Sequence, residues 1–194
     1  YHIGVTISGA IDQRNYKLAN LLTDNTLNET VIEFAYQGPL MRLNNGKINF
    51  AITGDVFFNI IRNNSVIEEG KCYQNYILND GEQIDIISTK NSIYGYLSVS
   101  GGFKLEEMWK SCSINTKAQI GPNNGKKYSV NQKIFIKKSV LENTKYRKVD
   151  YKNSYNNIVR VVKGTNFDYF SDKAKDIFFK EEFFVTRLAD RMGM

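Results

Sequence analysis

Residues 47–61 read KINFAITGDVFFNII, and large apolar side chains occupy every second position on either side of a central Gly-Asp pair. Because successive side chains of a β-strand point to opposite faces, a two-residue apolar period is typical of a strand with one buried face. The stretch therefore predicts two strands joined at Gly54-Asp55, where glycine suits a turn with a positive φ. The alternating residues are Ile48, Phe50 and Ile52 in the first strand and Val56, Phe58 and Ile60 in the second.

The same period continues outward from this stretch, from Thr30 to Val99. Clusters of Asn, Asp, Ser and Gly interrupt it at residues 62–65, 79–81 and 90–92, and such residues favour turns. We therefore predict a mainly β protein, in which short and regularly spaced strands build a barrel or a sandwich. One more predicted strand precedes this stretch and contains Ile32, Phe34 and Tyr36. Three others follow it, at residues 73–78, 83–88 and 93–99.

Two segments have features typical of helices instead. Residues 13–22 carry an apolar stripe with a 3.6-residue period, and Asp12 directly precedes them. A carboxylate at that place accepts hydrogen bonds from the free amides of the first turn, so Asp12 is predicted to be the N-cap. Ser171 or Asp172 is predicted to cap a second helix, which reaches Lys180.

The chain is expected to divide into three regions. Residues 1–140 are predicted to form the barrel subdomain, and residues 141–157, which are rich in Lys, Arg and Asn, a solvated linker. Ile158, Arg160 and Val162 alternate with Val159 and Val161, which predicts a strand that begins a second β subdomain over residues 158–194. One further short strand is predicted at residues 133–137.

The composition argues against several classes of protein. A net charge of +6 would suit a polyanion, but the basic residues are spread along the chain, so no nucleic-acid partner is expected. No run approaches the roughly 20 apolar residues of a membrane span, and we expect a soluble cytoplasmic protein with no membrane partner. Cys72 and Cys112 lack the paired spacing of a zinc site, and His2 is the single histidine, so no metal site is expected.

Diagnostic enzyme motifs are missing from the sequence. It contains no phosphate-binding glycine loop, no HExxH helix, no GxSxG turn and no lysine set between methionines as in biotin carriers. What stands out is a series of short segments: 4–5 (GV), 8–12 (SGAID), 18–22 (LANLL), Asn25, Glu33, 38–39 (GP), 51–55 (AITGD), 79–82 (NDGE), 96–99 (YLSV), 101–102 (GG) and 190–193 (DRMG). Their order and spacing resemble the biotin-dependent carboxyltransferase family that includes allophanate-hydrolase subunit 2 and the C-type subunit of 5-oxoprolinase.

The resemblance implies a fold of cyclophilin-like β-barrels and a function inside a bacterial complex. In that complex a B-type and an A-type subunit work beside this one, and ATP is used to open the lactam of 5-oxoproline to glutamate. The sequence itself shows no ATP site. Two alternatives stay open: a carboxyltransferase or allophanate/urea amidolyase-related subunit acting on a small amide, with biotin involved, and a non-catalytic antagonist of a histidine-kinase inhibitor.

Candidate site residues follow from the chemistry that amide substrates need. Carboxylates transfer protons, and glycines let backbone amides approach a ligand. The candidates for catalysis are Asp12, Asp55 and Asp190, and those for substrate binding are His2, Ser8, Gly9, Thr53, Gly54 and Arg191. Segments from both ends of the chain are predicted to line one cleft. The alternative roles are a helix cap for Asp12, a turn for Gly54, a surface ion pair for Asp190-Arg191 and a solvent-facing position for His2.

Two departures from the family pattern bear on these expectations. The family tends to carry a Gly-Ser-Arg-Ser-Thr-like loop where residues 110–114 read KSCSI, which leaves substrate contacts in that loop open. Members also usually carry residues on both sides of the stretch that matches this chain. We therefore expect the chain to be part of a longer subunit, and to show no oxoprolinase activity alone.

Overall fold

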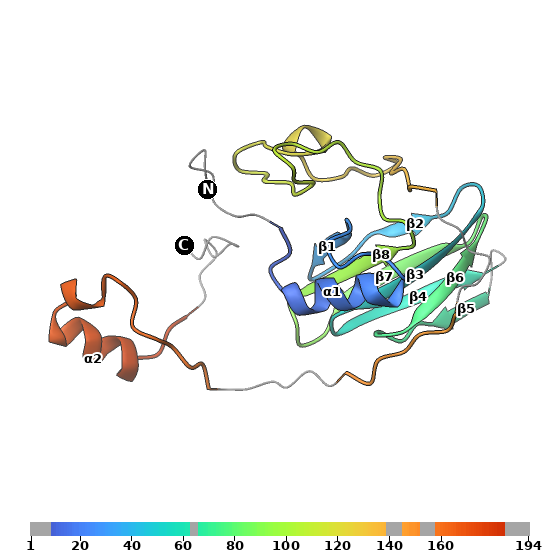
Figure 1. Ribbon diagram of the computed structural model, residues 1–194. Coiled ribbons are helices and arrows are strands. Elements are labelled where there is room, and N and C mark those ends of the chain that lie inside the picture. The colour runs from blue at the N-terminus through green and yellow to red at the C-terminus, as the bar shows by residue number, and fades with distance from the viewer. Residues whose placement is uncertain (1–8, 63–65, 139–144, 152–157, 185–194) are drawn as a thin grey trace. The chain divides into compact units, whose positions relative to one another are not determined.

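The computed structural model describes residues 9–62, 66–138, 145–151 and 158–184 (Figure 1). The chain divides into two compact units, residues 1–152 and residues 153–194. The first unit contains every strand that the structure describes and the helix α1 (Gln13–Leu22), and the second contains the helix α2 (Asp172–Lys180).

The strands of the first unit form two four-stranded sheets in which all pairs are antiparallel. Their arrangement confirms the predicted mainly β class. The first sheet has the order β1 (Ile32–Ala35), β8 (Tyr94–Val99), β3 (Lys47–Thr53), β6 (Asn75–Asn79), and the second has the order β2 (Leu40–Arg42), β7 (Gln83–Thr89), β4 (Val56–Arg62), β5 (Val66–Glu69).

The two sheets share one hydrophobic core, to which the alternating residues of the sequence contribute. Phe50 and Ile52 of β3 are completely buried, and Phe58 of β4 is 1% exposed. Ring contacts join the sheets, because Phe58 of the second sheet lies edge-on to Phe50 at 6.5 Å and to Tyr76 of β6 at 6.0 Å between ring centroids. The predicted two-residue period therefore identified the inward face of both central strands.

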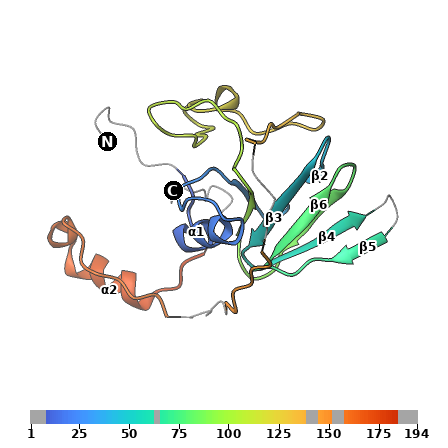
Figure 2. The ribbon, with the colours of Figure 1, turned by 45° about the vertical axis from the view of Figure 1, so that its right-hand side comes forward.

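The other face of the first sheet is polar, and α1 lies against it (Figure 2). Asn20 and Thr23 of α1 and Ser98 of β8 are all buried. The Ser98 hydroxyl lies 2.8 Å from the Thr23 hydroxyl and donates to Oδ1 of Asn20 at 3.0 Å. Because buried polar groups are costly without partners, this network ties the helix to the sheet in one register.

A long irregular segment, residues 104–138, follows the last strand. Its only helical turn is the 3₁₀ turn at Asn123–Gly125. The strand predicted at residues 133–137 is reduced to one bridge between Ile136 and Phe103, because the neighbouring backbone pairs no further. Lys137 N–H donates to the carbonyl of Gly102 at 3.0 Å, which fixes the segment's return to the sheet.

Residues 145–151, which we call the strap, run beside the end of the first sheet. The amide of Asn75 donates to the carbonyl of Arg147 at 3.1 Å, and the amide of Val149 donates to the carbonyl of Tyr73 at 2.9 Å. The Asn75 side chain adds a bond from Nδ2 to the carbonyl of Lys145 at 2.9 Å. The sequence placed these residues in a solvated linker, and their charged side chains gave no sign of this backbone pairing.

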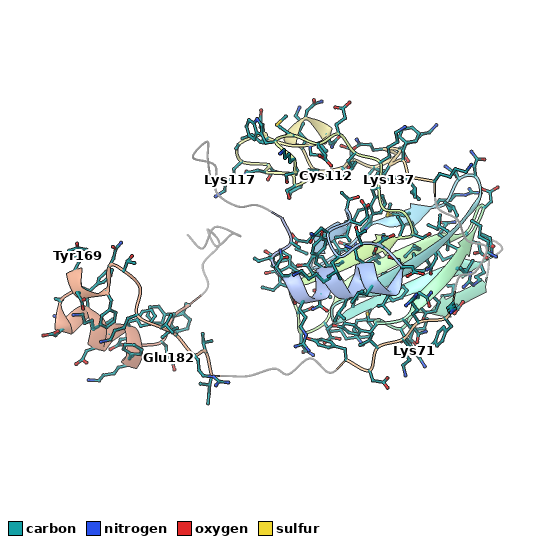
Figure 3. The ribbon with its side chains drawn as sticks, in the orientation of Figure 1. Lys71, Cys112, Lys117, Lys137, Tyr169 and Glu182 are labelled. Atoms are coloured by element: carbon teal, nitrogen blue, oxygen red, sulfur yellow. The ribbon has the colours of Figure 1, made fainter. Side chains whose placement is uncertain are left out.

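The second unit carries α2, capped by Ser171, whose hydroxyl accepts from the amide of Ala174 at 3.2 Å. This confirms one of the two predicted caps. No described residue of this unit is buried, and Figure 3 labels Tyr169 and Glu182 on it. The structure forms no strand at residues 158–162, so the strand predicted there is not found among the described residues.

Candidate functional site

The N-terminal end of α1 is organised around the carboxylate of Asp12. Its Oδ1 accepts hydrogen bonds from the amides of Arg14 and Asn15, both at 3.0 Å, and its Oδ2 accepts from Nδ2 of Asn15 at 2.7 Å. Asp12 is therefore the N-cap of α1, as the sequence predicted. The carboxylate is half-buried, and Oδ2 accepts one bond from the described residues, which leaves lone-pair capacity for a ligand donor.

Two side chains of the first sheet hold the backbone just before the helix. The amide of Asp12 donates to the hydroxyl of Tyr96 at 2.8 Å, and the amide of Ile11 donates to Oε2 of Glu33 at 2.9 Å. Tyr96 is completely buried, and this burial, together with a hydrogen bond to Glu33, raises the pKa of its phenol far above the ordinary value. Tyr96 therefore remains a neutral hydroxyl that positions the chain.

Thr53 and Gly54, at the turn between β3 and β4, join the same network. The Thr53 hydroxyl donates to the carbonyl of Asn15 at 2.8 Å, and the amide of Gly54 donates to the hydroxyl of Tyr73 at 3.2 Å. The Tyr73 hydroxyl in turn donates to Oδ1 of Asn15 at 2.9 Å. Gly54 has a φ of +105°, and an added Cβ would lie 2.9 Å from the carbonyl oxygen of Tyr94, so glycine is required there.

Asp55 serves a different purpose from its neighbours. Its Oδ2 accepts from Nδ2 of Asn91 at 3.0 Å, and its amide donates to the hydroxyl of Ser92 at 3.2 Å. These bonds link the turn between β3 and β4 to the connection between β7 and β8. The carboxylate of Asp55 is therefore engaged in turn structure, whereas Asp12, Thr53 and Gly54 are joined through Asn15 and Tyr73.

Several predicted site residues lie elsewhere or outside the described residues. Gly9 has a φ of +125°, and a Cβ there would lie 3.3 Å from Oγ of Ser113. Ser113 belongs to residues 110–114, the loop that departs from the family pattern. The predicted shared cleft between the two ends of the chain stays a prediction. The candidates outside the described ranges are His2, Ser8, Asp190 and Arg191.

Sequence reasoning missed Asn15, Tyr73 and Tyr96, which connect the predicted residues. Asn15 and Tyr73 are 4% and 8% exposed, and Tyr96 is completely buried. One signal was available for Asn15. It is a polar residue three positions after the predicted cap Asp12, close enough in a helix for the two side chains to meet. The hydroxyls of Tyr73 and Tyr96 carry no such signal, since tyrosines are common in strands for their rings alone.

A second group of titratable side chains lies at the long irregular segment, residues 104–138. Nζ of Lys137 and Oε1 of Glu29 form an ion pair at 2.7 Å. Burial pulls the pKa of Glu29 upward, but hydrogen bonds from Lys137 and Thr30 outweigh it and set this pKa below the ordinary value. Burial raises the pKa of the nearby Cys112 thiol, so it stays protonated at neutral pH and is a poor nucleophile.

The described ranges were predicted to hold neither a metal nor a membrane-spanning segment. Among these residues, no cluster of three or more His, Cys, Asp or Glu side chains could hold a metal ion. Within the same ranges, no helix combines the length and the apolar character that a membrane crossing requires.

The model of one protein family, described as carboxyltransferase domain, subdomain A and B, matches residues 3–194. The chain belongs to this family. The match confirms the resemblance that the short sequence segments indicated, and it spans both compact units of the structure.

Among curated members, the C-type subunit of 5-oxoprolinase from Haemophilus influenzae is 24% identical over 190 residues, which cover 98% of this chain and 59% of the relative. The corresponding Escherichia coli protein is 24% identical over 199 residues with the same two shares. Urea amidolyase of Lachancea kluyveri is 27% identical over 141 residues, which cover 73% of this chain and 7% of that protein. This carboxyltransferase-domain chain thus spans about three fifths of the two 5-oxoprolinase relatives.

Solved structures support the fold. The crystal structure of TTHA0988 is 22% identical and aligns with a TM-score of 0.67 over 78% of this chain and 54% of that one. The K. lactis urea amidolyase is 21% identical, with a TM-score of 0.61 over 66% of this chain and 8% of that protein. The fold of most of the carboxyltransferase-domain chain therefore recurs in solved structures.

Proposed function

We propose that this carboxyltransferase-domain chain is a subunit of an ATP-dependent 5-oxoprolinase complex, in which a B-type and an A-type subunit are its partners. The proposal is supported by the two relatives named as C-type subunits of 5-oxoprolinase, which match 98% of this chain. Both relatives are named as subunits, which also supports a heteromeric assembly. The small amide 5-oxoproline is the proposed substrate, and glutamate the product.

The observation that carries the chemistry is the half-buried carboxylate of Asp12 with remaining hydrogen-bonding capacity on Oδ2. In lactam opening, water adds its oxygen to the carbonyl carbon, the carbon–nitrogen bond breaks, and the nitrogen gains a proton. A positioned carboxylate takes a proton from the attacking water as its oxygen bonds to carbon, and gives that proton to the nitrogen as the carbon–nitrogen bond breaks. Asp12 is proposed for that role, and Thr53 and Gly54 are proposed to shape its surroundings.

ATP binding does not fit the described residues around this site. Phosphates bind at helix N-termini through free backbone amides. At α1 the amides of Arg14 and Asn15 already donate to the carboxylate of Asp12, whose negative charge would also repel a phosphate. We therefore derive no step through ATP here, and propose that a partner subunit holds it.

The test is Asp12→Asn in the complex reconstituted with its B-type and A-type subunits. An asparagine oxygen still caps the helix, so the free energy of unfolding should fall by at most about 1 kcal/mol. Loss of proton transfer should cut turnover of 5-oxoproline by about 10²-fold or more. Asp80→Asn is the matched control, because its carboxylate also accepts a backbone bond, from the amide of Asn45, but lies outside the candidate set, and its turnover should stay near wild type. Unchanged turnover in Asp12→Asn would leave Asp12 as a cap alone.

A carboxyltransferase acting on urea or a related amide is the second candidate, favoured by the similarity to the L. kluyveri urea amidolyase. The two candidates differ in their need for biotin. Turnover that requires a biotin carboxylase and a biotinylated carrier would favour the second, whereas turnover of 5-oxoproline with ATP alone favours the first.

A further inference from the structure

Tyr73 has an unusual backbone conformation for a large side chain. Its φ is +64°, in the left-handed region, and its side chain is 8% exposed. A bulky residue there costs free energy and persists only where its surroundings hold it. Its amide donates to the carbonyl of Ile52 at 2.9 Å, and its carbonyl accepts from the amide of Val149 in the strap at 2.9 Å. Two separate segments therefore fix this conformation.

The conformation places the Tyr73 hydroxyl between α1 and the β3–β4 turn. The hydroxyl accepts from the amide of Gly54 and donates to Oδ1 of Asn15. With its Oδ1 engaged in this way, Asn15 directs its Nδ2 group to Oδ2 of Asp12, at 2.7 Å. The Tyr73 hydroxyl thereby fixes both the orientation of the Asn15 amide and the donor that faces the Asp12 carboxylate.

We infer that Tyr73 is a positioning residue for the candidate site, and that the strap holds it in place. The catalytic role of Asp12 rests on the proposed function, whereas the bonds that position its carboxylate do not. Without the Tyr73 hydroxyl, Asn15 can rotate its amide, and the oxygen of Asp12 loses a fixed neighbour. Tyr73 acts on Asp12 through Asn15, so a substrate need not touch it.

The strap reaches Tyr73 through a second aromatic side chain. The ring of Tyr151 lies 4.8 Å from that of Tyr73, tilted by 47°. The guanidinium of Arg14, next to Asn15 on α1, lies 4.5 Å from the centre of the Tyr151 ring. The series Tyr73, Tyr151 and Arg14 thus returns to the helix that carries Asn15, and closes a loop of contacts around the site.

The experiment compares Tyr73→Phe with Tyr76→Phe. Tyr76 is the matched control, because its hydroxyl also accepts from a backbone amide, that of Lys71, and from the side-chain amide of Gln74, on the same strand region but away from Asp12. The probes are the nuclear magnetic resonance signals of the Asn15 side-chain amide and of the Gly54 backbone amide in the isotope-labelled chain, together with turnover of the reconstituted complex.

In Tyr73→Phe we expect both resonances to shift and the exchange rate of the Gly54 amide to rise about tenfold. The turnover number should fall about tenfold or more with little change in KM, because the reacting groups are misplaced while binding is kept. Tyr151→Ala should shift the same two resonances by a smaller amount. Tyr76→Phe should leave all these measurements near wild type.

The outcomes separate the inference from the proposed function. Unshifted resonances in Tyr73→Phe, or equal shifts in Tyr76→Phe, would overturn the positioning role. Shifted resonances with normal turnover in Tyr73→Phe would make the residue structural and overturn its role at the site. A wild-type complex without oxoprolinase turnover, combined with resonance shifts specific to Tyr73→Phe, would refute the proposed function and leave the positioning of Asp12 standing.

Discussion

The two units of the chain use similar apolar sequences in opposite ways. In the first unit the alternating residues of β3 lie in the shared core, and Phe50 is completely buried. In the second unit Ile158, Val162 and Phe184 are 72%, 93% and 82% exposed, although residues 158–162 (IVRVV) are as apolar as a buried strand. The difference teaches that apolar periodicity records the capacity of a segment to bury one face, and that burial itself depends on a facing layer.

The largest expected effect on the free energy of unfolding comes from Phe50, which is completely buried in the first unit. Phe50→Ala should lower the free energy of unfolding by about 3–5 kcal/mol, because it removes ring contacts and leaves a cavity. Phe178→Ala in α2 should change it by less than about 0.5 kcal/mol, since that side chain is 53% exposed. Urea unfolding followed by tyrosine fluorescence measures both. Equal losses would show that the second unit has a core of its own.

A comparison of two glycines comes next. Gly54→Ala should cost about 1–3 kcal/mol, because its φ is +105° and the new Cβ would meet the carbonyl of Tyr94. Gly164→Ala in the second unit should be neutral, since nothing lies within 4 Å of the added atom. Thermal unfolding of the two variants decides the matter, and a stable Gly54→Ala protein would contradict the tight approach of the turn to β8.

Stability measured over a series of alkaline pH values should sharpen the contrast between the two units, since both cysteines lie in the first unit. Burial raises the pKa of the Cys72 thiol from 9.0 to about 11. A raised pKa means that the thiol's contribution is complete below pH 9 and is lost as the pH rises toward about 11. The loss should be about 1–2 kcal/mol. Urea midpoints between these pH values should fall less steeply for Cys72→Ala than for wild type, and parallel curves would refute the shift.

The smallest expected effect concerns the ion pair of the strap. Nη2 of Arg147 and Oδ1 of Asp24 lie 2.9 Å apart, with the two side chains 42% and 76% exposed. Exposed pairs contribute little, so Arg147→Ala should lower stability by about 0.5 kcal/mol or less. The strap is held mainly by backbone bonds to Tyr73 and Asn75, so hydrogen exchange at Val149 should barely change. Rapid exchange there would show that the side chain holds the strap.

Much of the first unit could be predicted from the sequence, because its signals are local. The inward faces of β3 and β4 follow from period two, and the start of α1 follows from the capping chemistry of Asp12. The order of strands could not be predicted, since pairing depends on which distant segments complete each sheet. The strap was missed for the same reason, because its bonds use backbone groups that every sequence carries.

The candidate site was predictable in part. The cap at Asp12 and the turn at Gly54 were predicted correctly, because a carboxylate before a helix and a glycine in a tight turn have recognisable local roles, whereas their roles toward a substrate stay predictions. Asp55 carries the same functional group as Asp12 but bonds to Asn91 in a neighbouring turn, and no sequence pattern distinguishes the two environments. The role of Tyr73 depends on a left-handed backbone, which is not expected of a tyrosine.

The pairing of β1 with β8 has a consequence for how the chain is made. The residues that face each other, such as Ile32 and Leu97, belong to the first and the last of the described strands. At about 5–20 residues per second, a ribosome needs several seconds to extend the chain from one to the other. During that interval β1 has no partner and β3 lacks one of its two, so the growing chain presents open strand edges. The nascent protein is most exposed to aggregation before Tyr94–Val99 emerges, and chaperone protection should matter most in that window.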